Sequence, residues 1–176
     1  FLMIYSQYES YSYLALIIGL TSFTLYNTLT GKIFLGDCGS YFLSSFIAFS
    51  SLKAYQELNF PIFLFASFLI YPCYEIIRTI LTRFISSAPI MSPDNKHLHN
   101  YVNEFYLSCG FKINISNSLT GISIAVITSI PSLYSFFILG NLDSNFWLKL
   151  FITEFVCLAI TYHYFSKING KKSLSI

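Results

Sequence analysis

The sequence GKIFLGDCGS, residues 31–40, places one cation, one carboxylate, one hydroxyl and three glycines between two long apolar runs. An ionisable group at the edge of a membrane span is a candidate functional residue, because withdrawing its charge from water costs free energy. Glycines on both sides of Asp37 let the backbone approach a ligand closely, and a carboxylate oxygen beside exposed N–H groups suits Mg²⁺ and phosphate. The same residues are also typical of a polar turn between membrane helices, in which Asp37 caps the second helix.

The composition indicates an integral membrane protein. Of the 176 residues, 55% are hydrophobic and only 10% are charged, whereas soluble domains carry roughly 25% charged residues. The net charge of +2 is too small to indicate a nucleic-acid partner. The four cysteines are scattered without a CxxC pair, which favours reduced, structural thiols.

Five apolar runs predict an all-α, polytopic bundle of transmembrane helices, since about 20 apolar residues cross a bilayer. The predicted spans lie near residues 11–29, 39–52, 60–74, 119–139 and 147–165. Phe146 and Trp147 are expected in an interfacial aromatic belt, and Pro131 should kink the fourth span. Glu154 lies near the middle of the fifth span and has to pair with another group or face a polar cavity.

The distribution of lysine and arginine predicts the orientation. With five spans, one side of the membrane receives eight of the ten basic residues, and the other receives only Lys53 and Lys149. The N-terminus is then outside and the C-terminus cytoplasmic. Residues 31–40 and a polar loop over residues 75–112 share the cytoplasmic face.

This loop contains the pair His97 and His99. Two imidazoles near Asp94, Lys96 and two arginines suit the binding of an anion. A zinc site would need a third ligand, for which His163 is the candidate, and a plain solvated loop is the other alternative. Glu75, Arg78 and Arg83 are expected to be available to water or ligand, although the positive-inside rule alone accounts for both arginines.

Two blocks of this sequence resemble signatures of the polyprenyl-phosphate N-acetylhexosamine-1-phosphate transferases, glycosyltransferase family 4. One block is residues 31–40, preceded by Asn27. The other begins at Pro72 and Glu75, passes Arg83 and ends with PDNKHLHN, residues 93–100. The chain departs from the family pattern at several positions, which is typical of a divergent member nearer the N-acetylglucosamine branch. In this chain Cys38 stands where the family has a smaller residue, Glu75 where it has Asp, and Asn95 where it has Arg. Asn100 replaces a final His, and residues 86–88 replace a basic turn.

The resemblance implies transfer of N-acetylhexosamine 1-phosphate from a UDP-N-acetylhexosamine to a polyprenyl phosphate such as undecaprenyl phosphate, with release of UMP. The reaction would be the first membrane step of cell-wall, lipopolysaccharide or capsule synthesis. It would take place in the cell inner (cytoplasmic) membrane, on the cytoplasmic face, and a homodimer is compatible with it. By the same resemblance, Asp37, His97 and His99 are catalytic, and Asp37 holds Mg²⁺ or Mn²⁺. The substrate-binding residues are then Lys32, Gly36, Gly39, Ser40, Arg83 and Asp94.

The family's tandem-aspartate and Asn/Asp-rich motifs do not occur in these residues. We therefore expect residues 1–176 to be a single integral membrane domain, the C-terminal half of a longer enzyme, and to be inactive alone. The alternatives are a family relic that binds the lipid carrier without turnover and a transporter. A transporter would place its ligand groups at the bilayer midplane.

Overall fold

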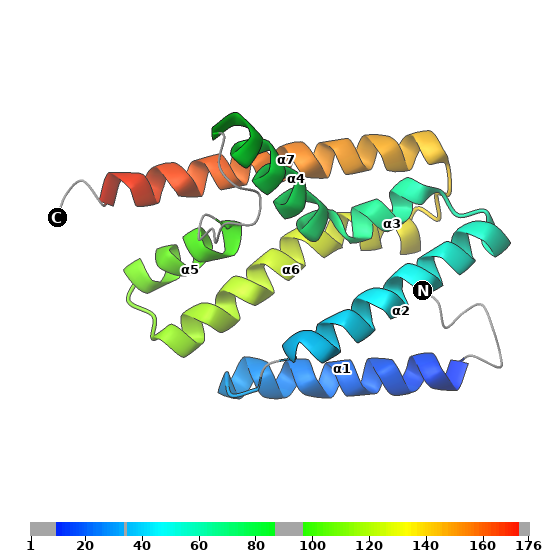
Figure 1. Ribbon diagram of the computed structural model, residues 1–176, viewed down its shortest axis with the longest axis horizontal. Helices are drawn as coiled ribbons and strands as arrows, with labels where there is room; N and C mark the ends of the chain where they lie inside the picture. The colour runs from blue at the N-terminus through cyan, green and yellow to red at the C-terminus, as the bar shows by residue number, and fades with distance from the viewer. Residues whose placement is uncertain (1–9, 34, 87–96, 173–176) are drawn as a thin grey trace. The chain divides into compact units, whose positions relative to one another are not determined.

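The computed structural model describes residues 10–33, 35–86 and 97–172, and these ranges hold seven α-helices (Figure 1). The all-α prediction is confirmed for them. The chain divides into two compact units, Phe1–Phe60 and Pro61–Ile176. Each unit is described by itself below.

The first unit contains α1 (Ser10–Thr30) and α2 (Gly36–Leu58). The last turn of α1 closes at Gly31, which adopts a left-handed φ of +62° and donates its N–H to the Asn27 carbonyl at 2.7 Å. This arrangement is common at helix ends, because glycine has no Cβ to penalise the left-handed conformation. The rings of Tyr13 and Phe46 meet edge to face, with 5.3 Å between their centroids.

The second unit contains the other five helices in the described ranges. They are α3 (Ile62–Phe68), α4 (Ile70–Ser86), α5 (Leu98–Ser108), α6 (Ile113–Phe137) and α7 (Ser144–Lys172). Both α3 and α5 pack against α6 and α7. The short α5 and the broken pair α3–α4 therefore share the same two long helices as their support.

A sharp break separates α3 from α4, whose axes differ by 85°. The region predicted as one span, residues 60–74, is therefore divided by a break, and the bent pair can still count as one broken span. The physical reason is Pro72 in the first turn of α4, which has no N–H to bond the Phe68 carbonyl and whose ring conflicts with that carbonyl. The neighbouring bonds survive, since Cys73 N–H still reaches the Leu69 carbonyl at 3.1 Å.

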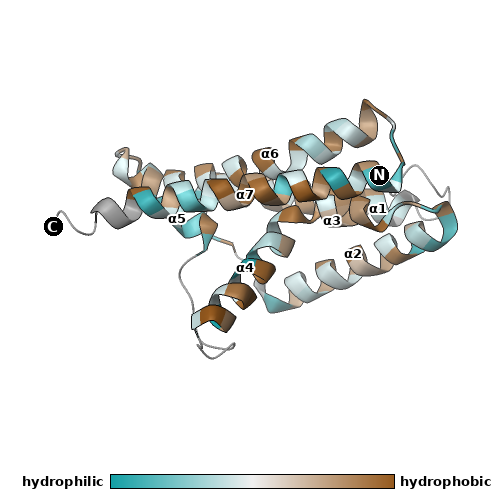
Figure 2. Ribbon diagram, turned by 90° about the horizontal axis from the view of Figure 1, so that it is seen from above, coloured by the Kyte–Doolittle hydropathy of each residue, from teal (hydrophilic) through white to brown (hydrophobic). Residues whose placement is uncertain are grey.

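Three helices in the described ranges are long and apolar enough to cross a membrane, or four if the bent pair is one broken span or re-entrant loop. The three windows are Tyr13–Thr30, Ile113–Phe137 and Ser144–Ile168, and Figure 2 shows hydrophobic residues distributed along α6 and α7. These helices support the prediction of a membrane protein, but their number is below the five expected. One predicted span that is not among these candidates lies in α2. This helix is 23 residues long but contains five serines, together with Lys53 and Glu57.

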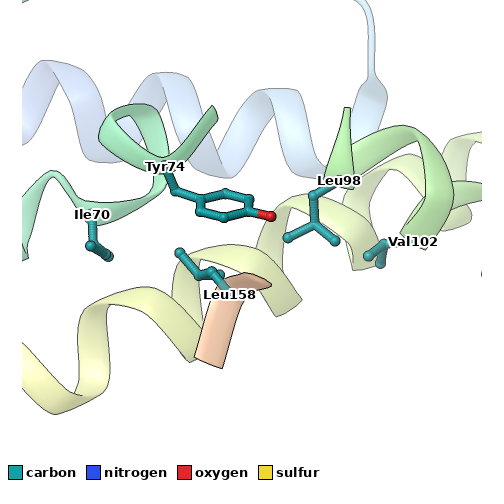
Figure 3. Close-up of a cluster of buried hydrophobic side chains, with 5 residues drawn as sticks. All are labelled: Ile70, Tyr74, Leu98, Val102 and Leu158. Carbon is teal, nitrogen blue, oxygen red and sulfur yellow. The ribbon is translucent and has the colours of Figure 1, made fainter. Parts of the chain in front are cut away.

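The core of the second unit lies where α4, α5 and α7 meet. It consists of the buried side chains Ile70, Tyr74, Leu98, Val102 and Leu158 (Figure 3). Figure 3 shows the Tyr74 ring directed toward Leu98, with Leu158 beside it. An apolar cavity of about 140 Å³ adjoins this cluster between α5, α6 and α7, and Leu98 lines it. Because Leu98 is the first residue of α5, this core also fixes where α5 begins.

Small polar residues are buried where α3, α6 and α7 pack, as is common between membrane helices. The Ser132 hydroxyl donates to Glu154 Oε1 at 2.9 Å, so the expectation that Glu154 pairs with a polar group is confirmed. Trp147 is fully buried, stacks on Phe68 and donates its indole N–H to the Asn141 carbonyl. The Trp147 ring therefore packs against protein, and its place in an interfacial belt stays a prediction.

Candidate active site

A buried carboxylate, Glu75, connects α4 to the start of α5. Its Oε2 lies 2.9 Å from His97 Nδ1 and 3.0 Å from an Arg78 guanidinium nitrogen, and its Oε1 accepts the Leu98 backbone N–H at 2.8 Å. The Glu75 and Arg78 side chains are only 11% and 9% exposed. Both are therefore largely shielded from water, and of the expected access to water or ligand only access to a ligand stays a prediction. The i,i+3 spacing places them side by side on α4, and the packed α5 covers Glu75.

The hydrogen bond from the Leu98 N–H to Glu75 takes the place of a local N-terminal cap on α5. His97 is the N-cap residue of α5, has an extended backbone and makes no side-chain capping bond. The first N–H groups of a helix lack intrahelical partners, and Glu75 supplies an acceptor from another helix. A carboxylate at this end also has a favourable interaction with the helix dipole.

The two histidines lie against each other. The His97 and His99 rings are stacked, with 5.4 Å between centroids and 6° between planes, and His99 Nδ1 is 3.1 Å from the Tyr71 hydroxyl. Partial burial, and secondly the neighbouring His97, lower the pKa of His99 below its usual range. The arrangement holds two imidazoles with fixed ring planes at the junction of α4 and α5.

Arg78 connects these residues of α4 and α5 to Tyr162 on α7. One guanidinium nitrogen donates to the Tyr162 hydroxyl at 3.2 Å, and the guanidinium carbon lies 4.7 Å from the centre of the Tyr162 ring. Such a cation–π contact adds to the hydrogen bonds. We call the residues Tyr71, Glu75, Arg78, His97, His99 and Tyr162 the histidine cluster.

The structure brings together two of the predicted site residues of the second unit, His97 and His99. Arg83 is half-buried in the last turn of α4, and Asp94 lies outside the described residues. Asn95 and Lys96 of the same motif lie outside them as well. The sequence interpretation gave no role to Tyr71 or Tyr162, because neither forms a pattern with the histidines along the chain.

The glycine-rich residues of the first unit gather at the start of α2. Asp37 is exposed in the first turn of α2. The N-cap is Leu35 rather than Asp37, so the alternative that Asp37 caps the helix is wrong. Gly36 has a φ of +67°, a conformation that favours glycine, and its carbonyl accepts the Ser40 hydroxyl at 2.8 Å.

The other predicted residues of this segment follow the same local geometry. Lys32 is exposed, and its backbone N–H donates to the Thr30 hydroxyl at 3.4 Å. Gly39 is half-buried, and a Cβ placed on it would lie 2.8 Å from Cγ of Leu35. The segment therefore presents a lysine and a carboxylate to solvent around a tight glycine turn.

The described residues contain no group of three or more His, Cys, Asp or Glu side chains that could hold a metal ion. A zinc site of His97, His99 and His163 therefore has no support. Mg²⁺ makes a different demand, since it is often bound by one or two carboxylates together with substrate phosphates and water. The exposed oxygens of Asp37 fit that partial role.

Comparisons with known proteins agree with the family resemblance. Residues 1–55 match the model of "Glycosyl transferase family 4". The chain is 30% identical over 141 residues to a probable undecaprenyl-phosphate N-acetylglucosaminyl 1-phosphate transferase of Bacillus subtilis, covering 79% of this chain and 36% of that protein. It is 29% identical over 87 residues to the undecaprenyl-phosphate alpha-N-acetylglucosaminyl 1-phosphate transferase of Thermotoga maritima, covering 49% of this chain and 28% of that protein.

The chain thus spans about a third of the length of the curated relatives that it matches. No solved structure matches it. The predicted resemblance is confirmed by the family match and the two relatives.

Proposed function

Given its relationship to glycosyl transferase family 4, we propose that this chain forms part of an enzyme that transfers N-acetylhexosamine 1-phosphate from a UDP-sugar to a polyprenyl phosphate. An oxygen of the lipid phosphate attacks the β-phosphorus of the UDP-sugar. The bond from that phosphorus to the bridging oxygen breaks, and UMP leaves with the electron pair. A polyprenyl diphosphate sugar remains in the membrane.

The observation that carries this proposal is the histidine cluster. It combines two imidazoles with a guanidinium group, and a buried carboxylate fixes their positions. Catalysis of phosphoryl transfer is mostly positioning together with neutralisation of charge on phosphate oxygens. His97, His99 and the half-buried Arg83 are suited to contact those oxygens, and Asp94 is proposed to act with them.

The glycine-rich segment is proposed to hold the metal. Asp37 would bind Mg²⁺ or Mn²⁺, and Gly36 and Gly39, which carry no Cβ in the first turn of α2, would let the backbone approach the phosphates. Lys32 and Ser40 are proposed to bind the same substrate. The metal, when bound, supplies Lewis-acid stabilisation of the diphosphate oxygens.

The membrane setting follows from the acceptor, since a polyprenyl phosphate stays in the bilayer. We propose an inner-membrane location, with the glycine-rich segment and the histidine cluster at the cytoplasmic face. The orientation rests on five crossings, in which α2 and the α3–α4 pair each count as one. Its test is labelling of single cysteines introduced at Lys53 and Lys149, which should react only with reagent added outside the cell.

The function is tested in membranes that contain the gene product carrying residues 1–176, supplied with labelled UDP-N-acetylglucosamine and undecaprenyl phosphate. We expect UMP release that requires Mg²⁺ and stops on chelation. Asp37→Asn should lower the rate by at least about 100-fold, since a lost charge-stabilising group typically costs that much. Glu57→Gln, an exposed carboxylate at the other end of the same helix, is the matched control and should retain the wild-type rate.

Two results would count against the proposal. If neither this nor another UDP-N-acetylhexosamine releases UMP from wild-type membranes, the transfer reaction is excluded. If Asp37→Asn keeps the wild-type rate, the metal-binding role of Asp37 is excluded while the reaction itself stands.

The broken helix and the buried Glu154 favour one second candidate, a transporter, because discontinuous helices build ligand sites in such proteins. The two candidates differ in what Glu154 does. Glu154→Gln should leave UMP release unchanged if the protein is a transferase. A transporter should instead lose ligand binding in this variant and release no UMP.

A further inference from the structure

We propose that Glu75 is a positioning residue that keeps His97 in one tautomer, with the proton on Nδ1 and the lone pair on Nε2. The tautomer follows from the geometry of the cluster. Only the use of Nε2 on a phosphate substrate rests on the proposed function.

The position of the proton follows from the contact between Glu75 Oε2 and His97 Nδ1 at 2.9 Å. A carboxylate oxygen and an unprotonated ring nitrogen are both acceptors, so one of them has to carry a proton at this distance. Arg78 lies 3.0 Å from the same oxygen, and the Leu98 N–H donates to the other one. Both contacts stabilise the ionised carboxylate, so the proton belongs to Nδ1.

A competing contact is longer. One Arg78 guanidinium nitrogen is 3.4 Å from His97 Nδ1. A guanidinium group has donors only, so this contact would need Nδ1 to be unprotonated. With Nδ1 unprotonated, its lone pair would face the Glu75 Oε2 oxygen at 2.9 Å, and two acceptors would repel each other. The shorter contact and the charge therefore favour protonated Nδ1.

The same carboxylate also fixes the backbone that carries both histidines. Its bond to Leu98 N–H anchors the first turn of α5, with His97 just before that turn and His99 within it. The Tyr71 hydroxyl lies 3.1 Å from Nδ1 of His99, and the His97 and His99 rings are stacked. Glu75 thus sets both the position and the protonation pattern of His97.

This arrangement leaves Nε2 of His97 as an acceptor. The suited ligand is a phosphate monoester, whose second pKa is about 6. Its remaining hydroxyl can hydrogen-bond to Nε2 or transfer its proton there. The imidazolium that results keeps its Nδ1–H on Glu75, so no other group has to move.

The test is the ¹⁵N NMR spectrum of the membrane-embedded gene product with labelled histidine. This chain has three histidines, and the His97 signals are those lost in His97→Gln. At a pH where the ring is neutral, we expect a protonated Nδ1 and an unprotonated Nε2. If the neutral His97 ring of the wild type carries its proton on Nε2, the proposal is overturned, independently of the results for variants.

Glu75→Gln sharpens the test. Either orientation of its amide leaves two donors facing each other, because the NH₂ group meets either Arg78 or the Leu98 N–H. We expect the variant no longer to hold His97 in one tautomer, and unchanged His97 signals contradict the proposal. Glu57→Gln is the matched control and should leave the His97 signals unchanged.

Activity gives a separate readout. Glu75→Gln should lower UMP release by about 10- to 100-fold, as for residues that orient a functional group, and Glu75→Asp should recover part of it. If the spectra agree with the proposal but wild-type membranes release no UMP, the proposed function fails and the positioning role stands. If UMP is released but Glu75→Gln matches wild type, the positioning role fails alone.

Discussion

The two polar regions that carry the family resemblance differ in what holds them. The glycine-rich segment is shaped by local backbone bonds around Gly31 and Gly36, and its Asp37 is exposed. The histidine cluster is held by contacts between residues up to 84 positions apart, such as Arg78 with Tyr162, and its Glu75 is buried. An exposed group can therefore be lost without harm to the fold, whereas a member of the cluster serves chemistry and stability together.

Arg78→Met should produce the largest loss of stability. It leaves the Glu75 carboxylate without its ionic partner in a buried setting, and breaking such a pair typically costs about 3–5 kcal/mol. We expect a clearly lower thermal midpoint in detergent. Lys149→Met, at an exposed position of α7, is the control.

The same measurement on Asp37→Asn tests the comparison directly. This variant should unfold at the wild-type temperature, although it loses activity. Equal losses of stability in Asp37→Asn and Arg78→Met would show that tertiary contacts do not set the histidine cluster apart from the glycine-rich segment.

Leu98→Ala should have the next largest effect. Leu98 is 2% exposed and lines the cavity beside α5, so truncation enlarges an existing void. Substitutions of this kind cost about 2–5 kcal/mol. Leu107→Ala on the same helix is the matched control, since Leu107 is 38% exposed. If both variants unfold at the same temperature, the start of α5 is not held by this core.

The smallest effect concerns pH. The folded-state pKa of His99 is lowered, so the folded protein binds its proton less readily than the unfolded chain does. Stability from this residue is therefore complete above the ordinary histidine pKa of about 6.5 and is lost as the pH falls toward and below the folded value. His99→Gln should show a smaller fall of the thermal midpoint between pH 7.5 and pH 5. An identical fall in both proteins would mean that other groups cause the acid sensitivity.

Part of the fold could be predicted from the sequence. Uninterrupted apolar runs predicted the helices that become α1, α6 and α7, because hydropathy over a span-length window is a local property. The prediction over residues 60–74 missed the break between α3 and α4, because hydropathy does not report such a break. The apolar character of this run is genuine, but Pro72 divides it into two helices at a sharp angle. The size of that angle depends on how α3 and α4 pack.

The candidate site divides in the same way. The motifs around Asp37 and at His97 and His99 were visible as residue types at short spacing, which is enough to indicate chemistry. Spacing along the chain could not reveal that Glu75 is buried, that it bonds the first N–H of α5, or that Tyr162 meets Arg78. These contacts join residues 23 and 84 positions apart.

The sequence by itself thus predicted a helical membrane protein with motifs that resemble those of glycosyl transferase family 4, because hydropathy, glycine turns and motif chemistry are all local. Tertiary structure alone decided which ionisable groups are buried and which acceptor stabilises the start of α5. The physical reason is that burial and hydrogen-bond partners depend on the segments that pack together, and the order of residues along one helix does not specify its neighbours.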